Sequence, residues 1–103
     1  MDDIIIIWTE FAAKELDNIF DYILNESKSF ETAAKLVDII FARTEQLRQM
    51  PLSGQEETYL KDFSVRYIVV GNYKIHYKYY DDKIIITDVF HTKRNPDNMK
   101  NQE

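Results

Sequence analysis

The second half of this 103-residue sequence contains both of its histidines and several lysines and arginines. Side chains of these types can bind a phosphate or transfer a proton. Period-two alternation over residues 73–80 predicts a strand with two different faces. The face expected to meet the interior carries Tyr73, Ile75, Tyr77 and Tyr79. The other face carries Lys74, His76, Lys78 and Tyr80 and would then form an exposed basic row. Such a row could bind phosphates or the acidic residues of a protein, although a solvated sheet face without function has the same pattern.

Further candidates flank this strand. Arg66 lies on the expected neighbouring strand, and His91, Lys93 and Arg94 follow at the end of the chain's last expected strand. His91, beside two cations, is a candidate for proton transfer, and Lys74 and Arg94 are candidates for stabilising charge on a phosphate. A hydrogen-bonding structural role is the alternative for a histidine at a strand end. The pattern by itself assigns no catalytic residue.

Several kinds of site are not expected. The sequence contains no cysteine, which excludes thiolate metal sites and a cysteine nucleophile. Neither histidine has a partner at the helical spacing of metal ligands, so we expect no metal site. The sequence has no glycine-rich phosphate loop and no serine elbow, and we expect no cofactor.

The charge distribution favours a function in the second half. The formal net charge is −5, which by itself disfavours nucleic acid as a partner. Residues 1–63 carry 6 Lys and Arg and 13 Asp and Glu, whereas residues 64–96 carry 6 and 3, so their net charges are −7 and +3. This asymmetry suggests that binding depends on the basic half, although small domains also divide charge unevenly by chance.

Two helices are expected to position these residues. A β-branched run over residues 4–8 predicts a buried strand, and Thr9 can cap a helix that continues to about residue 26. Ser29 can cap a second helix, which should end near Gln49 because Pro51 disfavours helical backbone at the residue before it. Residues 51–63 are polar and irregular, with Gly54 as the expected turn residue.

Three strands should follow, over residues 65–70, 73–80 and 83–90, with tight turns at residues 71–72 and 81–82. The order β-α-α-β-β-β predicts an α+β fold, in which an αα-hairpin packs on one face of a sheet built on a three-stranded antiparallel meander. The side chains expected to be largely buried are Leu16, Ile19, Ile23, Leu36, Ile40, Leu47, Ile75 and Tyr77. We expect a single domain over residues 1–96 and a polar tail over 97–103.

The N-terminal apolar run is too short to span a bilayer. It follows Asp2 and Asp3, whereas a signal peptide would begin with a basic segment. We therefore expect a soluble, cytoplasmic protein that does not contact a membrane.

A set of short motifs then resembles a known family. The first part of the set is Trp8, Ala12, Leu16, Ile19, Tyr22 and Ile23, then Ala33-Ala34, Leu47, Met50-Pro51 and Gly54. The second part is Arg66, the segment Tyr73-Lys74-Ile75-His76-Tyr77, and Val89-Phe90-His91-Thr92-Lys93-Arg94. In this order and spacing, from about Ile5 to Pro96, the sequence resembles the ParE/RelE superfamily of bacterial type II toxins, also called plasmid-stabilisation proteins.

The resemblance implies a toxin that arrests growth and forms a hetero-oligomer with a cognate antitoxin. The Pro-x-x-Gly segment and the Val-Phe-His-x-Lys-Arg ending look more like the ParE branch, whose studied members poison DNA gyrase. The RelE branch, the alternative, is a ribosome-dependent endoribonuclease that cleaves mRNA, usually with a tyrosine near its C-terminus. Here no tyrosine follows Arg94, and Lys74 stands where both branches often have arginine. A degenerate toxin that only binds its antitoxin is a further alternative.

The basic row and the resemblance together assign one set of residues to binding of the target or the antitoxin. These residues are Arg66, Lys74, His76, Lys78, His91, Lys93 and Arg94. Whether the protein is an enzyme stays open, because only the alternative of a ribosome-dependent mRNA interferase requires catalysis.

Overall fold

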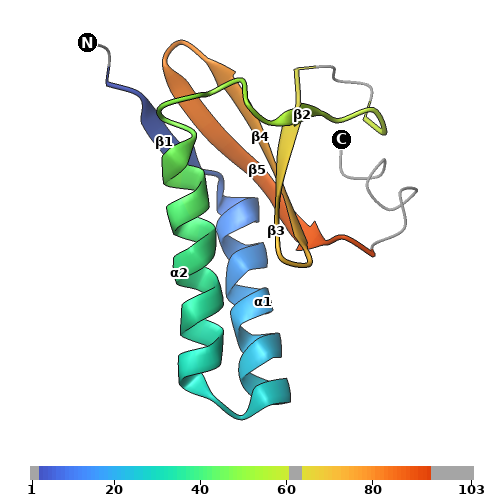
Figure 1. Cartoon of the computed structure of the whole chain (residues 1–103). Helices are drawn as coiled ribbons and strands as arrows, with labels where there is room; N and C mark the ends of the chain where they lie inside the picture. Colours follow the sequence, from blue (N-terminus) through green and yellow to red (C-terminus); the bar gives the residue numbers. More distant parts are fainter. Residues whose placement is uncertain (1–2, 61–63, 94–103) are drawn as a thin grey trace.

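A computed structural model of the chain describes residues 3–60 and 64–93, which form two helices and one five-stranded sheet (Figure 1). The helices are α1 (Glu10–Ser27) and α2 (Phe30–Gln46), and the strands are β1 (Ile5–Trp8), β2 (Gln55–Glu56), β3 (Arg66–Val70), β4 (Tyr73–Tyr80) and β5 (Lys83–His91). The α+β fold expected from the sequence is thus confirmed. The tail expected over residues 97–103 lies outside the described residues.

The strand order in the sheet is β1-β5-β4-β3-β2. The strands β3, β4 and β5 form the expected antiparallel meander, and the short strand β2, which the sequence did not predict, extends it on the β3 side. At the opposite edge β1 runs parallel to β5, with Ile5 opposite Lys83. The first strand of the chain therefore pairs with the last one.

Local side chains define the ends of the helices. The hydroxyl oxygens of Thr9 and Ser29 accept hydrogen bonds from the backbone amides three residues further on, at 3.1 and 3.2 Å, and so cap α1 and α2. Lys28 ends α1 in the left-handed region, with φ of 58°. Helix α2 ends at Gln46, three residues earlier than expected, because residues 47–49 tighten into turns whose amides bond to carbonyls two or three residues back.

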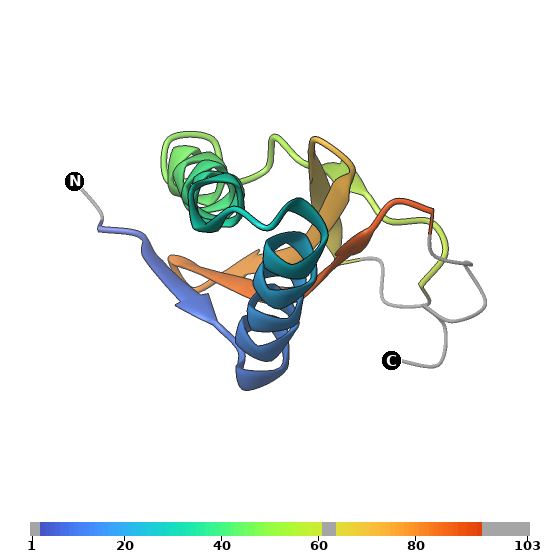
Figure 2. The same ribbon diagram turned by 90° about the horizontal axis from the view of Figure 1, so that it is seen from below.

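The two helices lie side by side, and Figure 2 views them from the tip of their hairpin. They share one apolar core with the sheet. Its buried members are Ala12, Leu16, Ile40, Leu47, Val70, Ile75, Tyr77, Ile84, Ile86 and Val89. Five of the eight residues expected in the core are buried, whereas Ile19, Ile23 and Leu36 are partly buried. Both helices therefore cover the same face of the sheet, as expected.

A buried tyrosine fixes the loop between α2 and β2. The hydroxyl of Tyr77 donates to the carbonyl of Pro51 at 2.7 Å and accepts from the amide of Gly54 at 2.9 Å. A Cβ atom on Gly54 would lie 2.5 Å from that hydroxyl and 2.9 Å from the carbonyl oxygen of Tyr67. Glycine is thus required here by the close approach of Tyr77 and of the Tyr67 carbonyl. Within the described residues, neither helix is both long and apolar enough to cross a bilayer.

Candidate functional site

One face of the sheet is not covered by the helices, and we call it the uncovered face. On this face β4 carries a buried charge cluster instead of an exposed basic row. Glu57, just after β2, places its Oε2 atom 2.8 Å from the Nζ atom of Lys74 and 2.8 Å from the Nε2 atom of His76. The exposed fractions of Glu57 and His76 are only 1% and 2%. The sequence prediction of exposure is therefore wrong for Lys74 and His76, because the segment after β2 brings a carboxylate onto them.

Hydrogen bonding decides the protonation of Glu57, whereas burial decides that of His76. Burial opposes ionisation of Glu57, but hydrogen bonds from Lys74, His76 and the backbone amide of Tyr59 outweigh it and lower the pKa of the carboxyl group. Burial also lowers the pKa of His76, although Glu57 favours its charged form. At neutral pH, therefore, His76 is neutral and donates its Nε2–H to an ionised Glu57.

The ammonium group of Lys74 has aromatic neighbours in addition to Glu57. It lies 4.0 Å from the ring centroid of Tyr67 and 5.7 Å from that of Tyr59. Lys78, two positions further along β4 on the same face, is partly exposed. The predicted row is thus reduced to Lys78 and the polar end of β4.

Arg66 lies on the other face of the sheet. It is opposite Tyr77, and its Nη1 atom donates to the carbonyl of Gly54 at 2.8 Å and to that of Leu52 at 3.3 Å. Its Nη2 atom lies 3.7 Å from the carboxylate of Glu56. These contacts hold the loop after α2, so that Arg66 and Lys74 do not form one binding surface.

His91 also faces the helices, so it lies on the opposite side of the sheet from the buried charge cluster, although it follows Phe90, the residue opposite Lys74. It is opposite Tyr73, and the two rings meet edge to face with centroids 5.4 Å apart. Its Nδ1 atom accepts a hydrogen bond from the amide of Lys93 at 3.1 Å, so the ring proton of a neutral His91 is on Nε2. In this arrangement a neutral His91 can donate a hydrogen bond from Nε2, while Nδ1, the nitrogen that would accept a proton, is already engaged by the amide of Lys93.

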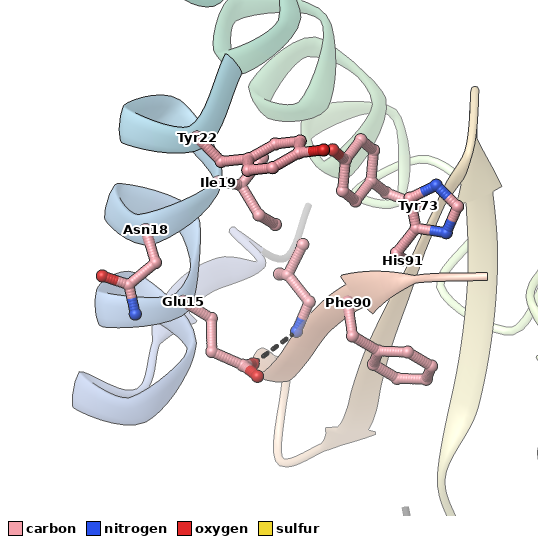
Figure 3. A pocket seen from close by; sticks show the side chains of 8 residues that line it. Glu15, Asn18, Ile19, Tyr22, Tyr73, Phe90 and His91 are labelled. Atoms are coloured by element: carbon pink, nitrogen blue, oxygen red, sulfur yellow. Dashed lines mark hydrogen bonds between the residues drawn. The ribbon is translucent and has the colours of Figure 1, made fainter. Parts of the chain in front are cut away.

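His91 lines a pocket between α1 and the end of β5 (Figure 3). Sequence reasoning missed the contribution of α1, where Glu15, Asn18, Ile19 and Tyr22 follow one another at spacings of three, one and three. This spacing places them on one side of a helix, which was the available signal. Val89 on β5 lines the pocket too, and its amide donates to Glu15 Oε1 at 2.8 Å.

The predicted site residues thus occupy separate places. Lys74, His76 and Lys78 lie on the uncovered face, Arg66 and His91 lie on the helix side, and Lys93 is exposed beyond β5. Arg94 lies outside the described residues. In the part of the chain that the structure describes, no group of three or more His, Asp or Glu residues is arranged to hold a metal ion. The described candidates favour binding over the assembly of a proton-transfer site.

Comparisons with known proteins agree with this architecture. Residues 6–96 match the family model described as the ParE toxin of the type II toxin–antitoxin system parDE. A solved structure from the chromosomal ParDE system of P. aeruginosa is similar in fold, with 22% sequence identity and a TM-score of 0.74, over 86% of this chain and 96% of that one. No curated protein sequence matches the chain significantly. Since the family model covers nearly the whole sequence, the chain belongs to the ParE family of toxins of type II toxin–antitoxin systems.

Proposed function

We propose that this toxin arrests growth by binding and inhibiting DNA gyrase, and that a cognate antitoxin neutralises it by forming a complex with it. Membership of the ParE family supports the proposal. The observation that favours binding over RNA cleavage is the engagement of Lys74 and His76 by Glu57, each at 2.8 Å.

This engagement argues against a phosphate-cleaving role for the uncovered face. A transition state of phosphate cleavage is stabilised by cationic donors aimed at the developing negative charge. Glu57 already places a negative charge against Lys74, and a neutral His76 adds no positive charge. An incoming phosphate would have to compete with a buried carboxylate for the same ammonium group.

The helical hairpin offers the antitoxin a more suitable surface than β4. Large apolar side chains are exposed along it, namely Phe11, Tyr22, Phe30, Ile39 and Phe41. Exposed apolar groups that gather on one element commonly mark interaction sites. We therefore propose the hairpin as the antitoxin-binding surface, and Lys78 and Lys93 as contacts to the target.

Two assays on the purified protein test the target. Inhibition of gyrase-catalysed supercoiling, with ribosome-bound mRNA left intact, is the expected result. Cuts within codons at the ribosomal A site, mapped by primer extension, would instead establish the RelE-like activity. In cells, induction without antitoxin should produce filaments and DNA-damage signalling before translation fails.

Single alanine substitutions separate binding from catalysis. Loss of one transition-state contact typically costs about 10²–10³ in rate, whereas exposed ion pairs contribute only about 0.2–1 kcal/mol each. We therefore expect Lys78→Ala and Lys93→Ala each to reduce gyrase inhibition modestly, and the double variant to reduce it further. Abolition of toxicity by His91→Ala alone, with an unchanged unfolding curve, would contradict a binding surface.

A further inference from the structure

Strand β1 forms one edge of the sheet, and among the described residues only β5 pairs with it (Figure 1). The amides of Ile5 and Thr9 donate to carbonyls at and just before β5, at 3.0 and 3.1 Å. Alternate residues of a strand turn their backbone groups to opposite sides. The amide and carbonyl groups of Ile6 and Trp8 therefore point away from β5, to the outer side of the edge.

This outer edge ends at Arg48. The guanidinium of Arg48 donates to the carbonyl of Ile4 and also pairs with Glu45, whose Oε1 atom lies 2.7 Å from its Nε atom. The carbonyl of Ile4 is thus already engaged. A strand that binds here has two residues of β1 to pair with, Ile6 and Trp8.

Large apolar side chains flank the edge on both faces of the sheet. Ile5 and Ile7 alternate with the residues that pack on the core, so they lie on the uncovered face, where they are 53% and 39% exposed. On the helix side the ring of Trp8 meets that of Phe41 edge to face, with centroids 5.3 Å apart, and Phe41 is 43% exposed. Strand β1 contains no charged residue and no proline, which are the residues that usually keep an edge strand from pairing.

We propose that the outer edge of β1 binds the same edge of a second copy of the chain, so that the two sheets join about a two-fold axis. In an antiparallel pair centred on Ile7, Ile6 of each copy lies opposite Trp8 of the other. Each of these pairs can exchange both of its hydrogen bonds, because the groups of Ile6 and Trp8 point outward. The carbonyl of Ile4 stays with Arg48. The open groups of β1 are thus complementary to themselves, as a two-fold interface requires.

A folded second copy fits this edge better than an extended peptide of another protein. A peptide would cover the sheet edge alone, whereas a copy presents both a sheet and a helix layer and so covers Phe41 as well. The exposed side chains of β1 carry no charge that an acidic or basic peptide could match. The opposite edge of the sheet is β2, two exposed polar residues, so pairing should stop at two copies. Phe41 also belongs to the surface proposed for the antitoxin, so the dimer is a state of the free toxin.

The mass of the free toxin tests the proposal. Sedimentation equilibrium should show that the 12.3 kDa chain converts reversibly, as its concentration rises, to a particle of twice that mass. Each copy has a formal net charge of −5, so the dimer should become tighter as added salt screens the repulsion between copies. A chain that stays monomeric at about 1 mM, or that forms larger particles without a dimer, would overturn the proposal.

A single substitution tests the position of the axis. Ile7→Lys places two ammonium groups next to each other across the axis and should weaken the dimer about tenfold or more. The matched control is Val69→Lys, since Val69 is an exposed aliphatic residue on the same face of β3, which β4 and β5 separate from β1. It should change the affinity by less than about twofold. Circular dichroism melting shows whether both variants fold, and equal weakening by two folded variants would overturn the proposal.

Hydrogen exchange of the wild-type chain, followed by NMR, tests the backbone pairing without any substitution. The amides of Ile6 and Trp8 should exchange more slowly as the concentration of toxin rises. The amides of Ile5 and Thr9, which are already bonded, should change little and serve as the internal control. Protection of Ile6 and Trp8 only after antitoxin is added, at every toxin concentration, would assign the edge to the antitoxin and overturn the proposal.

Discussion

Replacement of Glu57 by glutamine should destabilise the protein strongly, because it removes the charge that balances a largely buried lysine. The side chain of Lys74 is 14% exposed, and its Nζ atom lies 2.8 Å from Glu57 Oε2. Removing one partner of a buried ion pair typically costs about 3–5 kcal/mol. The glutamine oxygen still accepts from His76, and Lys74 keeps its contact with the ring of Tyr67 at 4.0 Å. Because these contacts remain, we expect a loss just below that range, about 2–3 kcal/mol.

Urea unfolding at pH 7.5, followed by tryptophan fluorescence and circular dichroism, measures this loss. With a slope of about 1–3 kcal/mol per M urea, the midpoint should fall by about 0.7–3 M. Heating should show a decrease in Tm of roughly 10–20 °C. The matched control is Glu56→Gln, since Glu56 is exposed and lies 3.7 Å from Arg66, and its loss should cost at most about 1 kcal/mol.

The double variant Glu57→Gln/Lys74→Met identifies the cause of the loss. Methionine removes the ammonium group that Glu57→Gln leaves without its counter-charge, so the double variant should be more stable than the single one. Equal midpoints for Glu57→Gln and Glu56→Gln, or a double variant less stable than Glu57→Gln, would refute the reasoning. If Lys74 is structural, as this cluster indicates, the double variant should also retain gyrase inhibition.

Three other predictions concern the same sheet. Tyr77→Phe should lower the free energy of unfolding by about 1–3 kcal/mol in urea, because the buried amide of Gly54 loses its acceptor. Gly54→Ala should cost about 1–3 kcal/mol in the same measurement, because the new Cβ would lie 2.5 Å from the Tyr77 hydroxyl; a neutral effect would show that the loop moves freely. Stability should fall with acid, because the folded protein lowers the pKa of His76 below 6.5 and that of Glu57 below 4.5. The unfolded chain then binds more protons, so the urea midpoint should begin to fall as the pH drops below about 6.5 and fall again below about 4.5; a constant midpoint from pH 8 to 4 would contradict both shifts.

The helices and the meander could be predicted because local signals specify them. The hydroxyls of Thr9 and Ser29 do cap α1 and α2, and strand β4 begins and ends at the predicted residues. The turn at residues 81–82 has φ of 53° and 56°, which the short polar side chains of two aspartates tolerate. Each of these features depends on residues that are neighbours in the sequence.

The charge cluster could not be predicted in the same way. Glu57 lies in a polar segment of the sequence. Nothing in its immediate sequence distinguishes it from its neighbour Glu56, which is exposed. Its partners are 17 and 19 positions further along the chain, so the pairing appears only when β2 and β4 take their places in the sheet. Alternation along β4 correctly predicted which residues share a face. It could not predict that Glu57 would bury part of one face.

The pairing of β1 with β5 has a consequence for synthesis on the ribosome. Ile5 lies opposite Lys83, 78 positions further along the chain, and β5 is also the strand against which α1 packs. During translation, at about 5–20 residues per second, the hairpin emerges several seconds before the strand that completes its core. We therefore expect nascent chains that stop before residue 83 to remain unfolded and open to proteases and chaperones. A cell that interrupts translation of this gene before residue 83 would release no folded toxin.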